Sequence, residues 1–214
     1  LYAFGSLCYI SSPEGLAKIN EACDRLGMDT ITAGNVIAFT MECFERGILS
    51  REDLGGLEVR FGNVEAVLEI LPMIAYRRGV GMVLAEGVRG ASKLIGKGSE
   101  EFAVHVKGLE PAGYDPRLLK GMALAYGTSD RGACHLRATF YKPELTGIVD
   151  PDEIHGKAAI FTEWEDRLTI FDTLIICRFY RDLYQWEQLG EIIEGITGLK
   201  LDKEGMRAIA ANVT

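Results

Sequence analysis

The strongest constraint on the fold is a series of apolar patterns with helical spacing, most of them closed by a glycine. In the stretch SSPEGLAKINEACDRLG, Ser12 is a typical N-cap, Pro13 suits the first helical position, and Gly27 suits the C-terminal stop. Between them, apolar side chains recur at helical spacing, at Leu16, Ile19, Cys23 and Leu26. The stretch therefore predicts an amphipathic helix.

The same criteria predict helices along most of the chain, at residues 35–47, 64–79, 81–96, 115–127, 151–180, 182–197 and 202–212. The first of these, over 35–47, is apolar nearly all round its axis, which predicts a central position. Pro72 should kink or divide the 64–79 helix. Only residues 57–61 and 103–106 are candidates for strands.

We therefore expect an all-α fold built from two packed helical domains. Residues 96–116 are rich in glycine and proline and interrupt the helical rhythm, so we place the domain boundary there. The expected domains are residues 1–105 and 106–214.

Charge and cysteine content exclude several classes of function. The net charge of −8 and the pI of about 5.0 argue against nucleic acid or an anionic membrane as the main partner. No apolar run approaches the roughly 20 residues needed to span a bilayer, and no signal peptide is evident. The five cysteines have no Cys-x-x-Cys pair, which favours reduced thiols and a cytoplasmic location. Because the chain begins at Leu1 within apolar sequence, we expect it to be an internal piece of a longer protein.

Two aspartates flank the glycine that ends the first helix. Asp24 lies in the last helical turn, where the helix dipole disfavours a carboxylate, and Asp29 follows Gly27. A ligand rich in N–H donors, such as a pterin ring, would compensate for this placement because carboxylates only accept hydrogen bonds. In the alternative interpretation, Asp24 is solvated and Asp29 caps the next helix through Thr30. Spacing alone favours that alternative.

Four blocks of the sequence together resemble the aldehyde ferredoxin oxidoreductases, which are tungsten-pterin iron–sulfur enzymes. The blocks are CDRLGMDTITAGNVIAFTMECFERGIL, VHVKGLEPAGYDPR, GMALAYGTSDRGACHLRA and FDTLIICRF. They agree in order and approximate spacing, from about Phe4 to about Phe179. The resemblance covers the two C-terminal helical domains of the family and lacks its N-terminal β-rich domain, which forms the base for the cofactor.

The resemblance implies two pterin-binding motifs of the form Asp-x-x-Gly-Leu-Cys/Asp. The first falls on Asp24, Gly27, Met28 and Asp29, with Met28 in place of leucine. The second falls on Asp172 and Cys177, with Ile175 and Ile176 in place of Gly-Leu. By resemblance, Asp24, Asp29 and Asp172 hold two pterins that chelate one tungsten, with Gly27, Met28 and Ile176 completing the two motifs. The sequence does not distinguish tungsten from molybdenum, since the metal's ligands are the dithiolene sulfurs.

The resemblance also implies a [4Fe–4S] cluster and a catalytic histidine. Cys177 would be the fourth thiolate of the cluster, whose other three cysteines and whose candidate base, a glutamate, are expected upstream of Leu1. The 214-residue piece alone is therefore expected to bind no cluster and to be inactive. His135 matches the histidine beside tungsten and would polarise the substrate; a core or helix-end histidine is the alternative. For the flanking Arg131 and Arg137, we expect salt bridges across the domain junction and not binding of the pterin phosphates.

The function that these motifs imply is oxidation of an aldehyde to a carboxylate, with two electrons passed through the cluster to ferredoxin. The implied partners are ferredoxin, a small aldehyde, the N-terminal domain and possible self-association into a homodimer. One alternative keeps the family but changes the substrate, for example to an aromatic-ring thioester. A second is a helical scaffold or partner-binding domain without catalysis.

Overall fold

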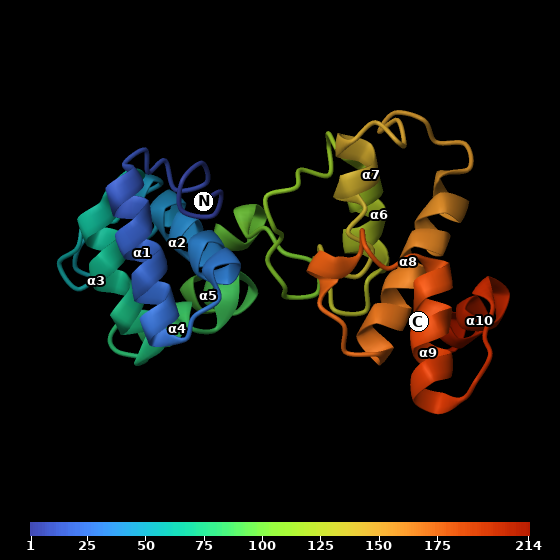
Figure 1. The fold of residues 1–214 in the computed structure, drawn as a ribbon. Helices are drawn as coiled ribbons and strands as arrows, with labels where there is room; N and C mark the ends of the chain where they lie inside the picture. Colours follow the sequence, from blue (N-terminus) through green and yellow to red (C-terminus); the bar gives the residue numbers. More distant parts are fainter. The chain divides into compact units, whose positions relative to one another are not determined.

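The computed structural model describes residues 1–214, and the chain is all-helical, as the apolar spacing predicts (Figure 1). Contacts within the chain divide it into two compact units, which are residues 1–113 with 130–133 and residues 114–129 with 134–214. The domain ranges 1–105 and 106–214 stay a prediction.

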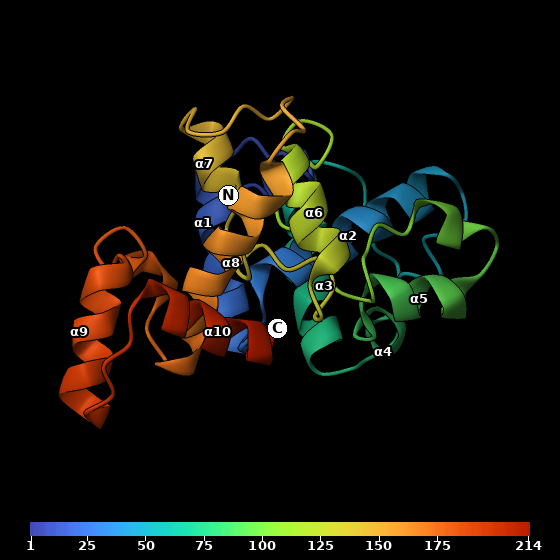
Figure 2. The same cartoon turned by 90° about the vertical axis from the view of Figure 1, so that its right-hand side faces the viewer.

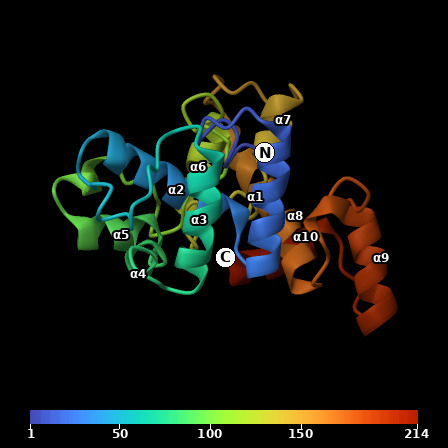
Figure 3. The same cartoon turned by 90° about the vertical axis from the view of Figure 1, so that its left-hand side faces the viewer.

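The first unit opens with two helices that are capped by side chains. Helix α1 (Pro13–Leu26) begins where Ser12 accepts a hydrogen bond from the Gly15 N–H, and α2 (Thr30–Glu45) begins where Asp29 accepts one from Thr32. Helix α3 (Val64–Ala75) lies beside α1 (Figure 3). Pro72 does not divide α3, which continues to Ala75.

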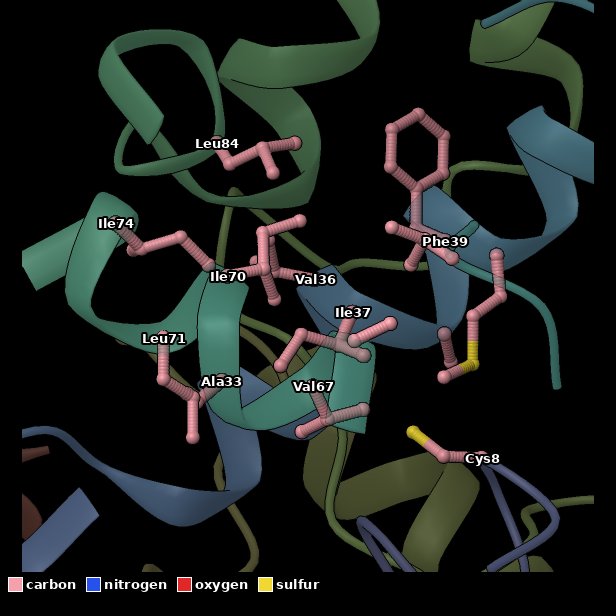
Figure 4. Close-up of a cluster of buried hydrophobic side chains, with 14 of the residues drawn as sticks. Cys8, Ala33, Val36, Ile37, Phe39, Val67, Ile70, Leu71, Ile74 and Leu84 are labelled. Carbon is pink, nitrogen blue, oxygen red and sulfur yellow. The ribbon is translucent and has the colours of Figure 1, made fainter. Parts of the chain in front are cut away.

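The core of the first unit gathers around α2, which is buried along most of its length, as its all-round apolar pattern predicts. Figure 4 shows Val36 and Ile37 of α2 lying among side chains of α3, with Cys8 at the edge of the cluster. Burial of such side chains contributes about 1.5–3 kcal/mol each. This packing holds the C-terminal end of α1 next to the start of α2.

The predicted 81–96 helix is instead two helices. Helices α4 (Gly81–Leu84) and α5 (Gly87–Ile95) are separated because Gly87 adopts a left-handed backbone with φ of 73°. Gly81 permits a close approach, since a Cβ there would lie 2.0 Å from the Met73 carbonyl oxygen.

Both strand predictions are wrong. Residues 57–61 form no ladder, and Val106 makes only an isolated antiparallel bridge to Leu109. A short apolar run forms a strand only when a second strand pairs with it, and neither run has a partner. A 3₁₀ helix, η1 (Ser99–Phe102), immediately precedes the second run.

The second unit contains α6 (Lys120–Thr128), α7 (Tyr141–Leu145), α8 (Lys157–Thr173), the 3₁₀ helix η2 (Arg178–Tyr180), α9 (Trp186–Thr197) and α10 (Lys203–Val213). Helix α10 packs against α8 and α9 (Figure 2). The buried Asp166 of α8 accepts a 2.8 Å hydrogen bond from Arg207 of α10.

Four helix starts differ from the sequence prediction. The helix expected from residue 35 begins at Thr30, and the helix expected from residue 182 begins at Trp186. The helix expected from residue 115 begins at Lys120, because the Asp115 carboxylate accepts the Arg117 N–H in a local turn. The helix expected over 151–180 is shorter, and Lys157 is its first residue. None of the helices combines the length and the apolar character that crossing a bilayer requires.

Candidate functional site

The first acid-bearing turn ends α1 in a Schellman motif. Gly27 is left-handed with φ of 66°, its N–H donates to the Asp24 carbonyl at 3.2 Å, and the Met28 N–H donates to the Cys23 carbonyl at 2.9 Å. Asp24 therefore lies one turn before the left-handed residue, on the outside of the helix end. Asp29 follows at once as the N-cap of α2.

The second acid-bearing turn ends α8 with the same pattern. Ile175 is left-handed with φ of 58°, its N–H donates to the Asp172 carbonyl at 3.1 Å, and the Ile176 N–H donates to the Phe171 carbonyl at 2.9 Å. Asp172 thus has the position that Asp24 has in the first turn. Replacement of the motif's glycine by Ile175 leaves the turn intact, at the cost of a β-branched residue in a left-handed conformation.

The two carboxylates have different surroundings. Asp24 is exposed, and its Oδ2 accepts one hydrogen bond of 3.3 Å from the neutral Asn20 side chain. Asp172 is 44% exposed, and its Oδ2 is bound by the Arg178 guanidinium and lies 3.5 Å from Nη1 of Arg137. Arg137 thus pairs with Asp172 within the second unit, and the salt bridges expected across the domain junction stay a prediction.

One carboxylate oxygen of Asp29 stabilises the fold by capping a helix. Its Oδ2 accepts the Thr32 N–H at 2.8 Å, which is the capping role of the alternative interpretation, two residues beyond Thr30. Asp24 and Asp29 both act on Cys23, whose pKa is raised to about 11 by burial first and by the two carboxylates second.

The cysteines divide into four buried ones and one exposed one. Burial raises the pKa of Cys8 to about 12 and that of Cys43 to about 11, and Cys134 is also buried. Cys177 is exposed and directly precedes η2, five residues after Asp172. No cluster of three or more His, Cys, Asp or Glu side chains is arranged to hold a metal ion.

His135 lies at the end of a stack of aromatic rings in the second unit. Its ring centroid is 6.0 Å from that of Tyr114, and Tyr114 stacks on Tyr141 at 3.9 Å with an interplanar angle of 4°. Arg181 lies over the Tyr141 ring at 5.9 Å. Burial, and then a hydrogen bond with Tyr141, raises the pKa of Tyr114 to about 12.

The residues of the two turns fit a flat ring that carries N–H donors. Oδ1 has no hydrogen-bond partner in either Asp24 or Asp172, so one oxygen of each carboxylate can accept from a ligand. A Cβ at Gly27 would meet nothing within 4 Å, which leaves space beside the first turn. A [4Fe–4S] cluster needs four thiolates, and this chain offers one exposed cysteine, so its residues do not build the cluster.

Sequence reasoning missed the residues that support these side chains. Arg178 is the next residue after Cys177, but its burial against Asp172 depends on tertiary packing. Tyr114, from another segment, lies beside His135 and stacks on Tyr141. The one available signal was the arginine inside the FDTLIICRF block.

The chain matches a family described as "Aldehyde ferredoxin oxidoreductase, domains 2 & 3" over residues 1–214. It is 34% identical over 184 residues to a tungsten-containing aldehyde ferredoxin oxidoreductase of Thermococcus kodakarensis, covering 84% of this chain and 30% of that protein. An "Aliphatic sulfonate oxidoreductase, WOR-like subunit" of Pyrococcus furiosus is 35% identical over 132 residues, covering 59% of this chain and 21% of that protein.

Among solved structures, the fold resembles one titled "Active site complex BamBC of Benzoyl Coenzyme A reductase in complex with 1,5 Dienoyl-CoA". The TM-score is 0.76 at 21% identity, covering 97% of this chain and 38% of that one, so the likeness concerns the fold. The chain spans about 30% of the length of the aldehyde oxidoreductases that it matches.

Proposed function

The chain belongs to the aldehyde ferredoxin oxidoreductase family, and on this premise we propose that it is the helical portion of a tungstopterin oxidoreductase. The full-length protein would oxidise an aldehyde to a carboxylate with water as the source of the added oxygen, releasing three protons and passing two electrons toward ferredoxin. The observation that carries the proposal is the repeated turn, in which Asp24 and Asp172 occupy the same position and each keeps one oxygen available.

In this proposal each turn holds one pterin by its edge. Asp24 and Asp172 accept N–H groups of the ring through Oδ1, and Asp29 has a second oxygen beside the one that caps α2. The tungsten bis-pterin, or its molybdenum counterpart, supplies the two-electron chemistry when bound. The chain's own contribution is to bind and orient that group, since each carboxylate is fixed by a helix end.

His135 and Cys177 have separate roles in the proposal. His135 donates a hydrogen bond to the aldehyde carbonyl, and the Tyr114 ring holds the imidazole from one side. Cys177 supplies one of the four thiolates of a [4Fe–4S] cluster, whose other ligands lie on a further part of the full-length protein. The exposed position of Cys177 supports this role.

The test is tungsten and pterin analysis of the full-length protein in three forms. The wild type should hold one tungsten and two pterins per chain, whereas Asp24→Ala and Asp172→Ala should each lose pterin and tungsten. Asp202→Ala is the matched control, because Asp202 caps α10 as Asp29 caps α2 and has no proposed ligand. An active wild-type protein without tungsten or molybdenum would sink the proposal.

A second candidate is the same chemistry on another substrate. The sulfonate-oxidoreductase relative has as high an identity as the aldehyde oxidoreductases, although it covers less of this chain. Turnover of aldehydes, of an aliphatic sulfonate and of an aromatic-ring thioester by the loaded full-length protein separates these possibilities. A scaffold without catalysis would carry no metal and turn over none of them.

A further inference from the structure

Arg178 is a largely covered cation whose guanidinium lacks one hydrogen-bond partner. Its side chain is 12% exposed. Its Nη2 binds Asp172, but its Nη1 is buried and has no hydrogen-bond partner. A buried donor without a partner costs its full desolvation, so Arg178 is a poor choice for a residue that only stabilises the fold.

Two guanidiniums meet one carboxylate at this turn. Arg137, whose side chain is 15% exposed, approaches the same Oδ2 of Asp172 that Arg178 binds. The two cations repel each other. Such an arrangement fixes the direction of the carboxylate at an electrostatic cost.

The two arginines are less accessible than the carboxylate that they bind. Both are mostly covered, whereas the Asp172 carboxylate is 44% exposed and its Oδ1 is uncommitted. In the first turn the corresponding Oδ2 of Asp24 is held by the neutral amide of Asn20, at 3.3 Å. In each turn, therefore, Oδ2 of the aspartate is bound by a neighbouring side chain and Oδ1 is left available. The neighbouring side chains are charged only in the second turn.

We propose that Arg178, with Arg137 as its second contact, is a positioning residue that directs Oδ1 of Asp172 at the pterin of the second turn. The inference rests on the proposed function, because it assumes that Asp172 binds that ring. The inference predicts that Arg178 contributes to cofactor binding and not to the stability of the fold. Loss of Arg178 should therefore lower cofactor retention without lowering thermal stability.

The test compares Arg178→Met and Arg178→Lys in the full-length protein. Arg178→Met should keep or raise the melting temperature of the cofactor-free protein, because the unpartnered donor and the buried cation are gone. Its tungsten and pterin affinity should fall about tenfold, as for other residues that orient a ligand. Arg178→Lys should recover part of the affinity, since it restores one donor but not the planar fork.

Arg207→Met is the matched control, because Arg207 pairs with Asp166 in the same unit, away from the turn. It should lower the melting temperature and leave cofactor affinity unchanged. Arg178→Met overturns the inference if it behaves like this control, if it fails to fold, or if it keeps full affinity.

Asp172→Ala separates the inference from the proposed function. Loss of cofactor in Asp172→Ala together with full retention in Arg178→Met rejects only the positioning role of Arg178. Full retention in Asp172→Ala rejects the proposed function of the second turn.

Discussion

Gly27 and Ile175 occupy the same position in two helix-ending turns, with φ of 66° and 58° and the same pair of backbone hydrogen bonds. Glycine adopts this conformation freely, whereas a β-branched residue is strained in it. The second turn therefore stores strain that the first turn does not.

This difference predicts opposite effects of reciprocal substitutions. Ile175→Gly should raise the free energy of unfolding by about 1 kcal/mol, because the left-handed strain is relieved and the 92% exposed side chain loses little packing. Gly27→Ala should lower it by about 1 kcal/mol through backbone strain alone, since a Cβ there meets no atom within 4 Å. Urea denaturation measures both.

Thr173→Gly is the control for Ile175→Gly, because Thr173 is exposed in the last turn of α8. It should be destabilising by about 0.5–1 kcal/mol, as glycine is in any right-handed helix. Destabilisation by Ile175→Gly to the same extent would contradict the account of the second turn.

Substitutions of the two aspartates of the first turn should change the free energy of unfolding by different amounts. Asp29→Ala should cost about 1 kcal/mol, because α2 loses its N-cap. Asp24→Ala should change stability by less than about 0.5 kcal/mol, because Asp24 is exposed and makes one long hydrogen bond. Equal losses in urea denaturation would show that Asp24 is structural.

The buried ion pair between Glu144 and Lys157 should be sensitive to loss of one partner. The Glu144 side chain is 0% exposed. Its Oε1 accepts hydrogen bonds from Nζ of Lys157 and from the Gly121 N–H, with donor–acceptor distances of 2.8 Å and 2.7 Å. Lys157→Met leaves this carboxylate unpaired and should cost about 3–5 kcal/mol. Adding Glu144→Gln should recover part of that loss, and an additive double variant in urea denaturation would contradict the pairing.

Tyr114 should make the second unit sensitive to alkaline pH. Its pKa is about 12 in the folded chain, above the value of about 10 for an unfolded tyrosine. Below pH 10 both states keep the proton; between pH 10 and 12 only the unfolded state loses it, so stability falls as pH rises through that window. Tyr114→Phe should show a shallower decline in urea denaturation, and parallel declines would be the contrary result.

Local signals predicted the parts of the fold that local interactions decide. Ser12 and Gly27 delimit α1 as expected, because capping depends on residues within one turn. The break at Gly87 and the late start of α6 at Lys120 were missed, since a glycine or an Asp-Pro turn is compatible with either outcome.

The sequence predicted the candidate ligand-binding side chains but not the residues that contact and orient them. Asp24, Asp172 and Cys177 were identified by resemblance, and their roles as ligand-binding residues stay predictions. The left-handed Ile175 has no sequence signal, because isoleucine rarely adopts that conformation. The contact between Arg137 and Asp172 joins residues 35 positions apart and depends on packing that no local pattern encodes.

The most direct test of the central claim is a crystal structure of the tungsten-loaded full-length protein, with the metal located by anomalous scattering. We expect one tungsten between two pterins, with Oδ1 of Asp24 and Oδ1 of Asp172 each accepting an N–H of a different ring. A tungsten bound elsewhere, with either carboxylate facing only solvent, would contradict the account.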